Sequence, residues 1–135
     1  MIISIEHLGI AVANPEKAKS TFEKLLDRKK EKSETVLSEN VETHFFKIGQ
    51  SQIELLESLN PEGVISKFIE KKGQGMHHLA LKTDDILFEI TRLKSLGFEF
   101  LSDSPKQGAD NKLIIFLHPR STEGVLIELC QDINF

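Results

Sequence analysis

The pattern of apolar and polar positions predicts the same order of elements twice along the chain. Residues 2–12 are rich in Ile and Val and stop before Asn14, which is the pattern of a buried strand. Asn14 is a suitable N-cap and Pro15 a suitable first helical residue, so residues 15–27 are expected to form an amphipathic helix. The first half is then completed by three strands, expected at 32–37, 41–48 and 52–57.

The second half repeats this order after a connector. A turn at 60–63 leads into a short helix that ends at Gly73 and Gly75. Residues 76–83 then have the composition of a strand, and Asp84-Asp85 is expected to cap a helix that ends at Gly97. Three further strands are expected at 98–101, 112–118 and 125–130.

The two halves also share short stretches of sequence. Residues 7–12 (HLGIAV) recur as residues 78–83 (HLALKT), and residues 53–57 (IELLE) recur as residues 127–131 (IELCQ). A chain that repeats itself once usually packs its two copies around a pseudo-twofold axis, so that equivalent strands meet. Four side chains would then be neighbours: His7, Glu54, His78 and Glu128.

These four residues predict a metal site. Neutral imidazole and carboxylate suit divalent metals of intermediate softness, and the set leaves Co, Ni, Mn and Zn open. Alternation along the strand places His7 on one face with Gly9 and Ala11, which leave room for an ion and a ligand. Two alternatives remain open, namely that each histidine is structural and that Glu54 lies on an exposed face of the sheet.

The other histidines and the cysteine are less informative. Alternation places His77 on the opposite face from His78, and His44 has no counterpart in the repeat, which favours a structural role. His118 lies at a strand end, where it could cap the loop or touch a substrate. Cys130 lies in an apolar strand, which favours a small buried side chain over a reactive thiol.

Composition and charge narrow the class of protein. The chain has 135 residues, of which 39% are hydrophobic and 28% charged, as expected for one globular domain. A net charge of −4 argues against a general nucleic-acid binder. Because the chain has no long apolar run, no secretory leader pattern and a single cysteine, we expect a cytoplasmic protein without a membrane partner. It also lacks a phosphate-binding glycine loop and a serine nucleophile elbow.

Six segments of the chain carry a family resemblance: 6–12, 53–57, 66–73, 75–80, 116–122 and 124–129. On these residues the chain resembles the vicinal oxygen chelate superfamily and, within it, the methylmalonyl-CoA epimerases. The resemblance implies an α+β fold of the glyoxalase/bleomycin-resistance kind, in which two paired βαβββ modules form a curved mixed sheet around a metal site. It implies a single domain over 1–135, with an N-terminal module at about 1–58, a connector at 59–75 and a C-terminal module at 76–135.

The resemblance also implies a reaction. It is the interconversion of (2R)- and (2S)-methylmalonyl-CoA by abstraction of the α-proton, with a divalent metal stabilising the enolate. Glu128 is expected to be the first base as well as a metal ligand. The second acid or base is open, because Thr43 stands where some family members carry glutamate, with Glu42 and His44 beside it. The implied metal ligands are His7, Glu54, His78 and Glu128.

An acyl-CoA substrate needs cations for its phosphates. By the resemblance, Lys67 and Arg120 are expected to contact the substrate, with Lys106 and Lys112 as further cations, and Ser121 is expected to donate a hydrogen bond to it. The family also suggests a homodimer. Two alternatives are a glyoxalase I-type lactoylglutathione lyase and a non-catalytic small-molecule-binding protein of the same fold.

Overall fold

The computed structural model describes residues 1–133, which form two compact units. The first unit combines Met1–His7 with the chain from His78 onward, and the second unit is Leu8–His77. Two strands, β1 (Ile2–Ala11) and β5 (Gly75–Thr83), run through both units. The predicted modules, by contrast, follow the repeat in the sequence, and their boundaries stay a prediction.

In the second unit the helices α1 (Pro15–Leu26) and α2 (Val64–Lys72) pack on a sheet in which β2 (Lys32–Val36), β3 (Val41–Ile48) and β4 (Ser51–Ser58) pair antiparallel. Its strands follow the order β2-β3-β4-β1, with residues 8–11 of β1 at the end. The strands expected at 41–48 and 52–57 are confirmed, and they form an antiparallel hairpin in which Ile48 lies opposite Ser51.

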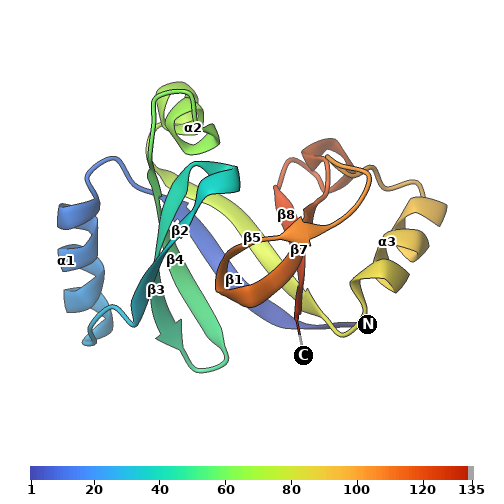
Figure 1. Ribbon diagram of the computed structural model, residues 1–135, viewed down its shortest axis with the longest axis horizontal. Helices are drawn as coiled ribbons and strands as arrows, with labels where there is room; N and C mark the ends of the chain where they lie inside the picture. Colours follow the sequence, from blue (N-terminus) through green and yellow to red (C-terminus); the bar gives the residue numbers. More distant parts are fainter. Residues whose placement is uncertain (134–135) are drawn as a thin grey trace. The chain divides into compact units, whose positions relative to one another are not determined.

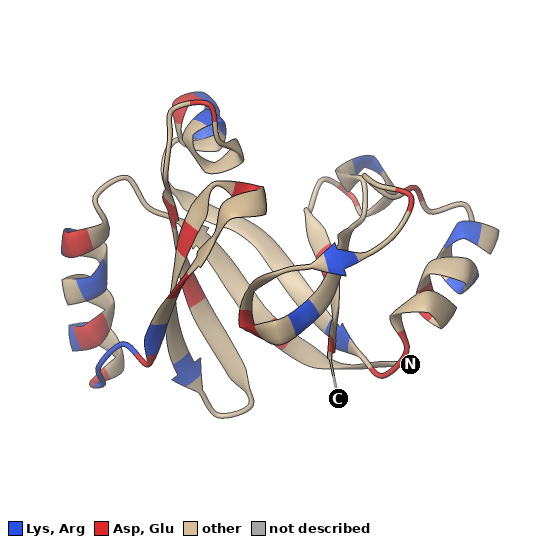
Figure 2. Ribbon diagram, viewed as in Figure 1, with Lys and Arg blue, Asp and Glu red and all other residues tan. Residues whose placement is uncertain are grey.

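Helix α1 runs alongside β3 and β4 (Figure 1) and packs through one apolar stripe. Phe22 lies against Phe46, with ring centroids 6.4 Å apart, and Asn14 caps the helix by accepting a hydrogen bond from the Lys17 N–H. The remaining surface of α1 carries residues of both charge signs (Figure 2). The amphipathic helix and its cap, both expected from the sequence, are therefore confirmed.

The first unit contains β5, β8 (Ile127–Asp132), β7 (Lys112–Phe116) and the short β6 (Lys106–Gln107), in that order. Strand β5 pairs parallel with β8, whereas β8 pairs antiparallel with β7. Helix α3 (Ile86–Ser95) packs its apolar stripe on these strands, around the buried side chains of Ile115 and Leu129. The segregation of helices and mixed strands confirms the expected α+β fold.

One expected strand is absent. Residues 98–101 form a single antiparallel bridge, between Phe100 and Leu117, and no longer ladder. Phe98 and Phe100 instead pack against the core formed with α3. The apolar alternation of this segment is thus used for packing against a helix, which sequence periodicity does not distinguish from strand pairing.

The remaining ordered segments are three short 3₁₀ turns, whose bounds are Leu37–Glu39, Ala109–Asn111 and Pro119–Ser121. None of the helices within residues 1–133 has the length and hydropathy of a membrane-spanning segment.

An ion pair on α3 predicts how stability depends on pH. Glu89 is 2% exposed and bonds Arg92, with 2.7 Å between Glu89 Oε2 and Arg92 Nε. Burial raises the pKa of Glu89, but the hydrogen bonds from Arg92 and from the Met1 amino group outweigh it and lower the pKa below 4.5. This contribution is therefore complete above the unfolded-state pKa and is lost as the pH falls through the lower, folded-state value.

We expect the Glu89→Gln variant to be less stable than the parent protein at pH 7 and to lose less stability on acidification. Urea unfolding midpoints measured between pH 7 and pH 3 check this. Parallel pH curves for the two proteins would contradict it.

Candidate metal centre

Three neighbouring strands of the first unit each contribute one candidate ligand. His7 lies on β1, His78 on β5 and Glu128 on β8, and these strands are adjacent in the order β1-β5-β8. In the parallel ladder the Cα partner of Glu128 is Ala80, which shares a face with His78 two residues earlier. The register therefore places Glu128 and His78 on one face of the sheet, over the small side chain of Ala80.

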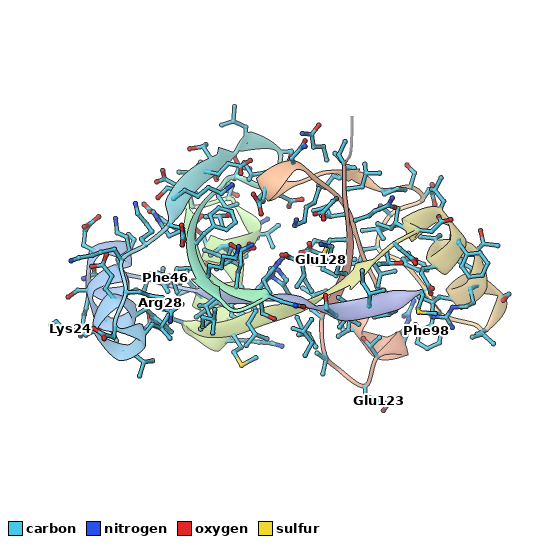
Figure 3. All side chains as sticks on the ribbon, turned by 90° about the horizontal axis from the view of Figure 1, so that it is seen from below. Lys24, Arg28, Phe46, Phe98, Glu123 and Glu128 are labelled. Carbon is cyan, nitrogen blue, oxygen red and sulfur yellow. The ribbon has the colours of Figure 1, made fainter. Side chains whose placement is uncertain are left out.

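The ligand atoms of these three residues lie close together. His7 Nε2 is 3.0 Å from His78 Nε2, and Glu128 Oε1 is 3.1 Å from His78 Nε2 and 3.7 Å from His7 Nε2. All three residues are buried. In Figure 3 Glu128 projects among other side chains, whereas Glu123, in the loop before β8, projects outward. The structure thus brings together His7, His78 and Glu128 within the first unit.

The carboxyl group of Glu128 is ionised in this setting. Burial raises its pKa, but the interactions with the imidazoles of His7 and His78 outweigh this effect and lower the pKa to about 2. At neutral pH the site therefore holds a buried negative charge beside two imidazole nitrogens. That combination is suited to a divalent cation.

A hydrogen bond to Nδ1 of His7 fixes which ring nitrogen faces the site. Glu6 Oε1 lies 2.7 Å from His7 Nδ1, and a carboxylate only accepts hydrogen bonds. This hydrogen bond therefore places a proton on Nδ1 and turns Nε2 towards His78 and Glu128. The His78 ring is held edge-on against Phe116, with centroids 5.4 Å apart.

The donor set fits a divalent metal. Ligand atoms that share one ion with bonds of about 2.0–2.2 Å lie roughly 3–3.7 Å apart, which matches the separations between the three atoms. The three ligand atoms also form one of the His and Glu groups compact enough to hold an ion. A cation would compensate the buried charge of Glu128 more fully than the two imidazoles do.

Glu54 belongs to the second unit. It is buried on β4 with Phe45 as its Cα partner in β3, so an exposed position on the sheet is wrong. Its role as a fourth ligand stays a prediction.

The substrate-binding predictions fall at two places. Arg120 and Ser121 lie in the 3₁₀ turn Pro119–Ser121, and both bond Glu99: the Arg120 guanidinium pairs with its carboxylate, and Ser121 Oγ accepts from its backbone N–H at 2.9 Å. Lys67 is exposed on α2 of the second unit. Their contacts with a substrate stay predictions.

The residues considered for a second acid or base lie on β3. Thr43 and His44 are both 2% exposed. His44 bonds Ser33 Oγ through Nδ1 (2.8 Å) and Glu57 Oε1 through Nε2 (2.9 Å). An imidazole with both nitrogens bonded inside one unit is typical of a structural histidine, as its lack of a repeat partner indicated.

Two residues near the centre were not recognised from the sequence. Glu6 precedes His7 on an Ile-rich strand, and its carboxylate in an apolar context was the only available signal. Lys112 was expected to be a cation available to phosphates, but it is 7% exposed and bonds Asp132. A lysine at the first residue of a buried strand cannot be told from a loop lysine by sequence pattern alone.

Comparison with known proteins agrees with this geometry. Residues 6–116 match the Glyoxalase/Bleomycin resistance protein/Dioxygenase superfamily. The chain therefore belongs to this superfamily, in line with its fold and its buried His and Glu residues.

Curated relatives narrow the assignment. The chain is 35% identical to the mitochondrial methylmalonyl-CoA epimerase of Mus musculus over 128 residues, 94% of this chain and 72% of that protein. It is 35% identical to the ethylmalonyl-CoA/methylmalonyl-CoA epimerase of Cereibacter sphaeroides, over 97% of this chain and 99% of that one. The crystal structure of methylmalonyl-CoA epimerase from Mycobacterium tuberculosis superposes with a TM-score of 0.93 at 29% identity, covering 98% of this chain and 90% of that chain. Within the superfamily, the chain belongs to the methylmalonyl-CoA epimerase family.

Proposed function

We propose that this protein is an isomerase that interconverts (2R)- and (2S)-methylmalonyl-CoA. The observation that carries the proposal is the convergence of His7, His78 and Glu128 at 3.0 to 3.7 Å in a buried position. The membership in the epimerase family supports the same activity. Neither the fold nor the site favours the glyoxalase I-type or the non-catalytic alternative.

The reaction makes a specific electrostatic demand. The α-proton beside a thioester is weakly acidic, so the negative charge that develops on the substrate oxygens must be stabilised. A divalent metal, when bound, supplies this as a Lewis acid. In this chain His7, His78 and Glu128 would hold it, and we propose Glu54 as the fourth ligand. The donor set accepts Co, Ni, Mn or Zn.

The chain's own residues must also move a proton from one face of the substrate and return one to the other. Glu128 was expected to act as base as well as ligand. A carboxylate with a pKa of about 2 is ionised at neutral pH, yet it is a weak proton acceptor. Its role as a ligand is therefore the better supported of the two.

For the acyl-CoA we propose contacts from Ser121, Arg120 and Lys67. Arg120 already pairs with Glu99, so a phosphate of the substrate would have to compete with that carboxylate. The expected homodimer and cytoplasmic location stay predictions.

Proton exchange tests the proposed activity directly. The protein is treated with a chelator, reloaded with Co, Ni, Mn or Zn, and incubated with one epimer of methylmalonyl-CoA in deuterated water. We expect incorporation of deuterium at the α-carbon and formation of the other epimer with at least one metal, and neither in the chelated protein. Mass spectrometry and chiral analysis of the product measure both.

Each alternative gives a different result in the same experiment. Turnover of methylglyoxal with glutathione, without deuterium exchange, would favour the lyase. Stoichiometric binding of the acyl-CoA with no exchange under any metal would contradict the epimerase and favour a binding protein.

A further inference from the structure

A buried lysine lies beside Glu6, the carboxylate that bonds the candidate ligand His7. Lys112 opens β7 and is 7% exposed, although lysine is among the residues least often buried. Its Nζ donates a hydrogen bond to Asp132 Oδ1 and lies 3.8 Å from both Glu6 Oε2 and Asp110 Oδ2. The ammonium group is therefore surrounded by three carboxylates of the first unit.

The sheet fixes the position of this lysine. Lys112 and Asp132 are Cα partners in the antiparallel ladder of β7 and β8, so their side chains stand beside each other. Asp132 Oδ2 also accepts from Lys82 Nζ on β5, at 2.7 Å. A carboxylate shared by two lysines on neighbouring strands restricts where the Lys112 ammonium group can lie.

Glu6 connects the lysine to the metal centre. One of its oxygens, Oε1, bonds His7 Nδ1 at 2.7 Å, and the other, Oε2, faces Lys112. A single carboxylate thus separates the Lys112 ammonium group from a candidate metal ligand. Glu6 is itself only 6% exposed, and a buried carboxylate is costly unless a cation compensates it.

The charge on Lys112 is maintained in this setting. Burial lowers its pKa, but the hydrogen bond to Asp132 and the charges of Glu6 and Asp110 outweigh burial and raise the pKa above its usual value. Lys112 is therefore a permanent cation next to Glu6 at neutral pH. When the ring nitrogen that does not bind the metal donates to a fixed carboxylate, the histidine has a fixed tautomer and ring orientation. Such a histidine binds metal more strongly.

We propose that Lys112 is a positioning residue of the metal centre: it holds the Glu6 carboxylate against His7 Nδ1, and so keeps His7 Nε2 directed at the ion. The proposal rests on the proposed metal site and is independent of which substrate the enzyme takes. It also removes Lys112 from the cations available to the phosphates of CoA.

Metal affinity and the visible spectrum of the Co(II)-loaded protein test this without any substrate. We expect Lys112→Met to weaken Co(II) binding by roughly 10–100-fold, as is usual when a partner of a metal-bound histidine is lost, and to change the Co(II) absorption bands. Glu6→Gln should do the same. Lys112→Arg, which keeps the cation, should restore affinity to within about threefold of the parent, because the guanidinium also pairs with carboxylates.

A double substitution tests whether Lys112 acts through Glu6. If it does, the variant with both Glu6→Gln and Lys112→Met should bind Co(II) about as well as Glu6→Gln alone, because the second change has nothing further to remove. If the fold-losses of Co(II) affinity of the two single variants multiply in the double variant, Lys112 does not act through Glu6, and the proposal is overturned.

Glu89→Gln is the matched control, since it removes a buried carboxylate that pairs with a cation elsewhere in the same unit. It should lower stability and leave Co(II) affinity and spectrum unchanged. An equal loss of affinity in the control, or a folded Lys112→Met variant that binds Co(II) like the parent, would overturn the proposal.

Two further outcomes need their own measurements, namely a Lys112→Met variant that does not fold and a parent protein that binds no metal. Should Lys112→Met fail to fold, Asp132→Asn loosens the same lysine more gently, and we expect roughly 3–10-fold weaker binding with the same spectral change. Parent-like binding by Asp132→Asn would then overturn the proposal. If the parent protein bound no Co(II) at all, the proposal of a metal site would itself be contradicted. That result can be told from one in which the parent binds Co(II) and the variant binds it equally well, which would overturn only the role of Lys112.

Discussion

Replacing His78 with alanine is expected to lower kcat/KM for methylmalonyl-CoA on the order of 10³-fold and to remove most of the bound metal. His78 Nε2 is the central atom of the candidate site, because it lies within 3.1 Å of both His7 Nε2 and Glu128 Oε1. A metal ion contributes several kcal/mol to the stabilisation of developing charge, and about 1.4 kcal/mol corresponds to a tenfold change in rate. Metal content by elemental analysis and initial rates of epimerisation measure the two effects.

The neighbouring histidine provides the matched control. His77 precedes His78 on β5, but its ring packs edge-on against Phe68 of α2, with centroids 4.9 Å apart. We expect His77→Ala to keep its metal and to retain activity to within about threefold. A His78→Ala variant with full metal content and activity, or a His77→Ala variant as inactive as His78→Ala, would contradict the assignment of the site.

The sequence could indicate which side chains lie together at the candidate centre because strand geometry is simple. Successive side chains on a strand alternate between faces, so the repeated His-Leu pattern indicated which histidine of the pair His77-His78 belongs with His7. The Glu at the equivalent place in the last strand of each half then followed from the repeat. What confirmed the position of Glu128 was the register of β5 and β8, which no pattern within a single strand encodes.

The parts that sequence did not predict depend on contacts between distant segments. Strict alternation would put Glu6 and His7 on opposite faces, yet both side chains are buried and the Glu6 carboxylate bonds the imidazole. The environment of Lys112 is created by Asp132, its partner across the β7-β8 ladder. Phe98 and Phe100 likewise use their apolar pattern to pack with α3. In each case a tertiary contact decided the outcome between options that were locally equivalent.

Truncating Leu129, the residue after Glu128, is expected to lower the stability of the protein strongly and to leave the candidate metal ligands in place. Leu129 points to the other face of β8 from Glu128, is 1% exposed and packs with Ile115 and Leu117 in the core that α3 covers. Leu129→Ala removes three carbon atoms from this core and leaves a cavity. We expect the free energy of unfolding to fall by about 2–5 kcal/mol.

Urea unfolding measures this change, with Val125→Ala as the control. Val125 is 47% exposed in the loop before β8, so its truncation should change the free energy of unfolding by less than about 0.5 kcal/mol. Because His7, His78 and Glu128 are untouched, folded Leu129→Ala protein should still bind metal under conditions well below its unfolding midpoint. A loss below about 1 kcal/mol would mean that Leu129 does not anchor the core on which α3 packs. A variant that stays folded but loses its metal would mean that the two faces of β8 are not independent.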